Sequence, residues 1–160
     1  MLKEILRIIE DNARTTTKQI SAMTGVSGPE VTKLIKQAEK DRVILKYKTV
    51  INWDKVDNEQ VWALIEVRVT PQKDVGFDSI AERIYQFPQT RTVYLISGTY
   101  DLFVLVVGKS NREIADFVSQ KLSHVEGVRD TVTQFVLKRY KEDGEFIGGE
   151  EEIRRQPVML

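Results

Sequence analysis

Residues 15–40 read TTTKQISAMTGVSGPEVTKLIKQAEK, and this stretch decides the fold of the first third of the chain. The spacing from Thr16 to Gln19 fits a capping box, which predicts a short helix that ends at Gly25. A second S-x-x-E pattern begins at Ser27 and predicts a longer helix. Two helices joined by a turn of three residues are the sequence form of a helix-turn-helix.

Apolar residues recur at helical spacing through the first 40 residues, and a further amphipathic helix is expected before residue 12. Three such helices bury their apolar stripes against one another, because none of them is stable alone. The residues expected to face this core are Leu2, Ile5, Leu6, Ile8, Ile9, Ile20, Met23, Val26, Val31, Leu34, Ile35 and Ala38.

The opposite face of the longer helix presents hydroxyl, amide and ammonium groups, which suit phosphates and base edges. The predicted DNA-contacting residues are Ser27, Thr32, Lys33, Lys36, Gln37 and Lys40. From the periodicity alone, the solvated face of an ordinary three-helix bundle explains the pattern equally well. Charge adds a second indication: residues 1–48 hold ten Lys or Arg against six Asp or Glu, whereas the whole chain of 160 residues is neutral.

Composition excludes much catalytic chemistry. The chain has no cysteine and one histidine, His124, so disulfides, thiolate zinc sites and thiol nucleophiles are excluded, and little remains for a histidine-based triad. We therefore expect no enzyme, no catalytic or metal-binding residues and no cofactor. Charged residues make up 30% of the chain, and neither a membrane-spanning run nor a signal peptide is apparent, which predicts a cytoplasmic location.

After residue 42 the pattern changes. β-Branched and aromatic residues with alternating lysines over 43–51 predict a connecting strand, and the polar stretch that follows places a domain boundary near residue 52. We expect a helix-turn-helix (winged-helix-like) domain over 1–52 and a second domain over 53–141. The remainder, 142–160, is rich in glycine and glutamate and is expected to be a flexible acidic tail.

The second domain contains the same pattern of strand, helix and strand twice, which predicts an α+β fold of the ferredoxin-like βαββαβ type. Its helices cover one face of a four-stranded antiparallel sheet. The other face is apolar too, since Trp62 and Leu64 alternate with Ala63 and Ile65, so we expect a second copy to cover it. A third internal layer would need helices that the chain does not have. The expected strands are 61–70, 92–97, 102–107 and 128–139, with helices over 77–87 and 110–122.

Two short stretches are candidate ligand contacts. Ser97, Gly98, Thr99, Tyr100 and Asp101 join the middle strands, where an amide, a hydroxyl and a carboxylate meet and suit a zwitterion. An ordinary hairpin turn explains the same residues without any ligand. In the last strand the hydroxyls of Thr131 and Thr133 share one face, although strand propensity is a sufficient reason for both threonines.

The chain resembles the Lrp/AsnC (feast-or-famine) family of transcriptional regulators. The resemblance rests on Met23-Thr24-Gly25-Val26-Ser27, on Gly98-Thr99-Tyr100-Asp101-Leu102, and on Gly127-Val128 followed by Thr131 and Thr133. It implies a transcriptional regulator that binds double-stranded DNA and has an effector-sensing RAM domain. Such proteins dimerise through their sheets and often form octamers. It also implies an effector, usually an amino acid, bound between dimers near Gly98, Tyr100 and Asp101.

Two rival functions follow from the residues themselves. A metabolite-sensing module that acts on a protein partner needs the second domain but no DNA contact. A small ferredoxin-like enzyme needs convergent reactive groups, against which the cysteine-free composition argues.

Overall fold

The computed structural model describes residues 1–56, 60–70 and 76–147. The chain divides into two compact units, residues 1–51 and 52–160, and each unit has its own hydrophobic core. The first unit contains α1 (Leu2–Asp11), α2 (Thr17–Thr24) and α3 (Gly28–Lys40), as the helical periodicity predicts. Their apolar stripes meet in a core of buried side chains that comprises Ile5, Ile9, Ile20 and Val31.

The turn between α2 and α3 has the predicted chemistry. The Thr16 amide donates a 2.9 Å hydrogen bond to Gln19 Oε1, and Gln19 returns one from its amide to Thr16 Oγ1, which completes the capping box. Gly25 ends α2 with a left-handed φ of 71°, a conformation that a side chain disfavours. Ser27 then caps α3 by accepting a hydrogen bond from the Glu30 amide. The helix-turn-helix is thus defined by local hydrogen bonds.

Three expectations for this unit are wrong. Leu2, expected in the core, is 36% exposed at the first position of α1. Met23 is 64% exposed; it lies one residue before the end of α2, a helix of eight residues in which only Ile20 is buried. Residues 43–51 form no strand; residues 1–51, all of which the structure describes, contain helices only. The amides of Val43 and Ile44 instead both donate to the Ala38 carbonyl at the end of α3. β-Propensity alone does not make a strand without a neighbour to pair with.

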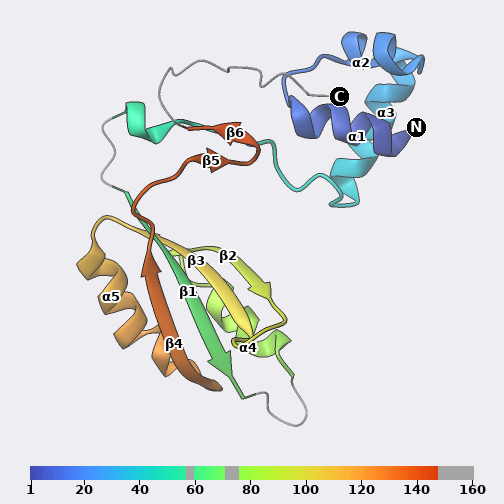
Figure 1. Cartoon of the computed structure of the whole chain (residues 1–160). Coiled ribbons are helices and arrows are strands. Elements are labelled where there is room, and N and C mark those ends of the chain that lie inside the picture. Colours follow the sequence, from blue (N-terminus) through green and yellow to red (C-terminus); the bar gives the residue numbers. More distant parts are fainter. Residues whose placement is uncertain (57–59, 71–75, 148–160) are drawn as a thin grey trace, which may run out of the picture. The chain divides into compact units, whose positions relative to one another are not determined.

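The second unit follows the predicted βαββαβ order. The strands are β1 (Val61–Val69), β2 (Thr90–Leu95), β3 (Leu102–Gly108) and β4 (Val128–Phe135), and the helices are α4 (Asp78–Tyr85), α5 (Asn111–Gln120) and the 3₁₀ turns η1 (Trp53–Lys55) and η2 (Leu122–His124). The sheet has the strand order β2-β3-β1-β4, with every pair antiparallel, and Figure 1 shows the four strands side by side. β1 and β3 are the central strands.

Both long helices pack on the same face of the sheet. Every second residue of β1 and of β3 is buried there against apolar side chains from α4 and α5. The helices contribute Ile80, Ile84, Ile114 and Phe117, and the strands contribute Ala63, Ile65, Val67, Val69, Leu102, Val104 and Val106. The side chains between them point to the other face of the sheet.

The C-terminal part departs from expectation. β4 ends at Phe135 rather than at residue 139, and a small hairpin follows, made of β5 (Lys141–Glu142) and β6 (Glu145–Phe146). Ile147 after the hairpin is 4% exposed. The flexible tail expected from residue 142 is therefore ordered over 142–147, because one apolar side chain anchors it. Residues 148–160, with the run Glu150-Glu151-Glu152, lie outside the described residues.

A pair of glycine substitutions tests the turn of the first unit. At both Gly25 and Gly28 an added methyl group would meet no atom within 4 Å, but only Gly25 has a left-handed φ. We expect Gly25→Ala to lower the free energy of unfolding by about 1 kcal/mol, and Gly28→Ala, in the first turn of α3, to leave it unchanged or raise it. Chemical denaturation followed by circular dichroism measures both. Equal effects of the two substitutions would contradict the assigned turn.

Candidate DNA-binding face and effector turn

The exposed side of α3 carries three cations. Lys33, Lys36 and Lys40 are exposed, and none of them forms an ion pair with another residue in the part of the chain that the structure describes. Val31 and Ala38 turn the other side of the helix toward the core. We call the three lysines the lysine face.

The other three predicted DNA contacts are engaged within α3 or its caps. Ser27 Oγ accepts the Glu30 amide hydrogen bond at 3.4 Å, and Thr32 Oγ1 donates to the Gly28 carbonyl at 3.0 Å. The Gln37 amide nitrogen donates to both carboxylate oxygens of Asp41, at 2.8 and 2.9 Å. Reading a base edge would cost Gln37 these bonds, whereas the lysine face is available without rearrangement.

The end of α3 is tied to the segment that follows it. Tyr47 Oη donates a 2.8 Å hydrogen bond to Glu39 on the last turn of the helix. Partial burial, this hydrogen bond and the charge of Glu39 together raise the pKa of Tyr47. The hydrogen bond to Glu39 thus favours the protonated, donating form of Tyr47.

A sharp turn over residues 96–101, which we call the sensor turn, joins β2 to β3. The Asp101 amide donates to the Val67 carbonyl at 3.1 Å, and Asp101 Oδ2 accepts the Val69 amide at 2.9 Å. The Ile96 amide closes the turn on the Asp101 carbonyl. Asp101 thus holds the turn against the end of β1, and one of its carboxylate oxygens is occupied in doing so.

Three residues of the sensor turn are open to solvent. Ser97, Gly98 and Thr99 are exposed, and Gly98 has a φ of 157° with open space around its α-carbon. The guanidinium of Arg68 lies over the ring of Tyr100, 5.1 Å from its centroid, and Arg68 Nη2 donates to the Thr99 carbonyl at 3.3 Å. The turn therefore presents a cation as well as the Asp101 carboxylate.

The sequence pattern does not single out Arg68. In the sequence, Arg68 is one polar residue of an alternating strand. Only the antiparallel pairing of β1 with β3 places the end of β1 beside the turn that precedes β3. A signal is present in the sequence nonetheless, because Arg68 is the only basic residue within β1.

The two candidate threonines lie on the edge strand β4. Thr131 is opposite Val67 and Thr133 is opposite Ile65, both of which are buried beneath the helices. The two hydroxyls therefore share the helix-covered side of the sheet, and both residues are half-buried. Thr131 is close to the sensor turn, since the carbonyl of its partner Val67 accepts the Asp101 amide. Thr133 lies two residues further from the turn.

The sheet face without helices is largely apolar. Cross-strand pairs place Leu64 beside Leu105 and Tyr94 beside Phe103, and Tyr94 is 61% exposed. Trp62 Nε1 is buried yet has no hydrogen-bond acceptor among the described residues. We call this surface the open face; its apolar members are Trp62, Leu64, Tyr94, Phe103, Leu105 and Val132, and Glu66 lies among them, opposite Phe103 and Val132.

Comparison with known proteins matches both units. A winged helix-turn-helix DNA-binding domain matches residues 2–44, and the Lrp/AsnC ligand-binding domain matches residues 62–146. A relative from Bacillus subtilis, the uncharacterized HTH-type transcriptional regulator YugG, is 46% identical over 94% of this chain and 92% of its own. The chain belongs to the Lrp/AsnC family of transcriptional regulators. It is thus a DNA-binding regulator with a ligand-binding domain, and nothing in these matches supports a module without DNA binding.

Further Lrp/AsnC relatives support the same assignment. LrpA of Pyrococcus abyssi, an HTH-type transcriptional regulator, is 30% identical over 87% of this chain and 96% of its own. Among solved structures, a regulator from Neisseria meningitidis in complex with L-methionine shares the fold, with a TM-score of 0.68, 24% identity and coverage of 87% and 89%. A feast or famine regulatory protein from M. tuberculosis, also complexed with L-methionine, has a TM-score of 0.70, 20% identity and coverage of 91% and 96%.

The structure of this Lrp/AsnC regulator also bears on other kinds of site. No group of three or more histidine, aspartate or glutamate side chains is placed to hold a metal ion in the ranges described. Within the same ranges, no helix is long and apolar enough to span a membrane. The matched relatives are named as transcriptional regulators rather than enzymes.

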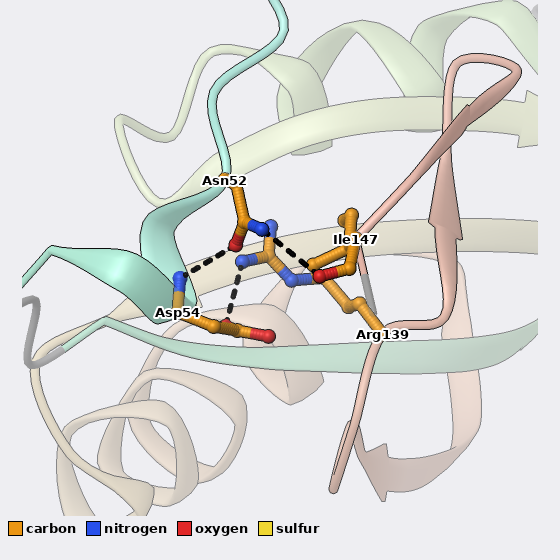
Figure 2. A network of polar contacts seen from close by, with 4 residues as sticks. All are labelled: Asn52, Asp54, Arg139 and Ile147. Atoms are coloured by element: carbon orange, nitrogen blue, oxygen red, sulfur yellow. Dashed lines mark hydrogen bonds and ion pairs between the residues drawn. The ribbon is translucent and has the colours of Figure 1, made fainter. Parts of the chain in front are cut away.

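A polar network holds the start of the second unit (Figure 2). Asn52 donates from Nδ2 to the Ile147 carbonyl at 2.9 Å and accepts the Asp54 amide at Oδ1. Arg139, whose side chain is only 14% exposed, donates to Asp54 at 3.4 Å and lies over the Trp62 ring. The bonds of Asn52 to Ile147 and of Arg139 to Asp54 join residues 95 and 85 positions apart, so the segment that follows the linker over residues 43–51 is held by residues on either side of the C-terminal hairpin.

Proposed function

We propose that this protein is a sequence-specific DNA-binding regulator, active as an even-numbered homo-oligomer, whose DNA affinity changes when an amino acid binds at the sensor turn between dimers. It acts in the cytoplasm, without a cofactor or catalytic residue. The family membership and the lysine face support the DNA partner. Two relatives of the same fold complexed with L-methionine support an amino acid as the effector.

The lysine face is the observation that carries the DNA contact. In a helix-turn-helix the second helix enters the major groove, and lysines along it reach phosphates as point charges. Lys33, Lys36 and Lys40 are exposed on that helix, while Ser27, Thr32 and Gln37 need to release helix contacts before they bind bases. We therefore assign most of the affinity to the lysines and sequence reading to the polar residues.

Substitution of the lysine face tests the DNA contact. We expect Lys33→Ala and Lys36→Ala each to weaken binding to every DNA sequence. Each should also reduce the magnitude of the negative slope of log K against log salt concentration by about 1, because one phosphate contact is lost. Lys121→Ala, which removes an exposed cation from the second unit, is the control and should leave the slope unchanged. Fluorescence anisotropy at several salt concentrations measures all three. Unchanged slopes for both α3 variants would contradict the proposed face.

The open face supports assembly through the sheets. An apolar surface on two central strands is costly to leave in water, and a twofold symmetric contact covers it on both copies at once. Dimers formed in this way can associate further into octamers through other surfaces.

A charge placed on the open face tests the dimer. We expect Leu64→Glu to give a monomer, because the carboxylate would be buried opposite apolar side chains of the second copy. Ala115→Glu places the same charge on the exposed side of α5 and should keep the oligomeric state. Light scattering after gel filtration measures both masses, and circular dichroism checks that both variants fold. A dimeric Leu64→Glu protein would refute this interface.

The effector can change DNA affinity only by binding one arrangement of the assembly more tightly than another. The sensor turn suits this role because Asp101 connects it to β1, a strand of the open face. Asp101 is the first candidate for the effector's ammonium group. Ser97, Gly98, Thr99 and Tyr100 lie in the same turn, and Thr131 and Thr133, on the helix-covered side of β4, are the further candidates.

Asp101 is best tested with a substitution that keeps the turn. Asp101→Asn retains an oxygen to accept the Val69 amide but removes the charge, so we expect normal folding and DNA binding without effector. Effector affinity should fall by about 10- to 100-fold, the range for one hydrogen bond to a charged group. Calorimetric titration with the twenty L-amino acids measures this. Full effector affinity in Asp101→Asn would remove Asp101 from the site.

A further inference from the structure

Arg68 is a cation directed at the sensor turn. It is exposed near the end of β1, and its side chain extends over Tyr100 and bonds to the Thr99 carbonyl. The register of β1 and β4 places a carboxylate, Asp130, directly opposite Arg68, yet the two form no ion pair within 4.0 Å among the described residues. Arg68 therefore leans toward the turn even though an acidic residue is its cross-strand neighbour.

The contacts of Arg68 leave most of its binding capacity unused. A guanidinium has five N–H donors, and one hydrogen bond, from Nη2 to Thr99, accounts for the bonds it makes within the described residues. The contact with the Tyr100 ring and this bond hold the guanidinium beside the turn, which reduces the entropy lost when an anion binds. A carboxylate fits a guanidinium because two parallel N–H donors can bond to its two oxygens.

The turn then offers both charges that a free amino acid needs. Asp101 uses Oδ2 for the Val69 amide, which leaves Oδ1 for a positive group. Arg68 is the residue immediately before Val69, so cation and anion are held by neighbouring positions of β1.

We propose that Arg68 binds the α-carboxylate of the effector and makes the site selective for free amino acids over amines and amino-acid amides. This inference rests on the proposed function, in which an amino acid binds at the sensor turn. The competing role for Arg68 is purely structural, in which it only holds Thr99 and Tyr100 in place. The two roles differ in what they predict for a ligand without a carboxylate.

The experiment compares the full-length wild type with three variants. The wild type is titrated calorimetrically with each of the twenty L-amino acids, and the tightest-binding one is then compared with its α-amide. Arg68→Gln removes the charge. Arg68→Lys keeps the charge but cannot form the two parallel hydrogen bonds of a guanidinium. Arg91→Gln is the matched control, since Arg91 is exposed on β2 at the end of the sheet away from the sensor turn.

We expect the wild type to bind the amino acid at least about tenfold more tightly than its amide. Arg68→Gln should lose that preference by weakening only the amino acid, Arg68→Lys should lie between, and Arg91→Gln should match the wild type. Two results for Arg68→Gln would overturn the role of Arg68 while leaving the effector proposal in place. One is an equal loss of affinity for the amino acid and for its amide, and the other is an affinity for the amino acid within twofold of the wild type. A wild type that binds none of the twenty amino acids would overturn the effector proposal together with it.

Discussion

The alternation of side chains along β1 is the constraint on which the second unit depends. β1 is a central strand, paired with β3 on one side and β4 on the other, so it has no free edge. Ala63, Ile65 and Val67 point into the core that α4 and α5 close, and the residues between them must then point away. Trp62 and Leu64 form part of the open face for this reason. The two-residue period that builds the core therefore also builds the surface that we assign to a second copy.

The end of the same strand gathers the groups that we assign to the effector. The Val67 carbonyl and the Val69 amide both bond to Asp101, and Arg68 between them reaches over Tyr100. A ligand that pulls on Arg68 or Asp101 therefore acts on β1 directly, and β1 also contributes to the open face. This short connection is a physical reason why an effector at the turn can alter assembly, and through assembly the DNA affinity.

The boundary between the two units is held in a different way. Asn52 and Asp54 are bonded to Ile147 and Arg139 from the far end of the chain, and Arg139 also stacks on Trp62 (Figure 2). On the other side of the linker, Tyr47 is bonded to Glu39 on α3. Each end of the linker is therefore attached to its own unit by side-chain hydrogen bonds, although the apolar residues of the linker pair with no strand.

The sequence by itself determined the helices, the helix-turn-helix with its capping box and Gly25, and the βαββαβ order, because these depend on periodicity and on bonds between residues a few positions apart. It also indicated the lysine face and the sensor turn. Only the tertiary structure decided that residues 43–51 are not a strand, that a hairpin follows residue 140, and that Arg68 reaches the sensor turn. These features depend on which distant segments become neighbours, as Asn52 and Ile147 do, and strand pairing and long-range side-chain contacts leave no periodic trace in the sequence.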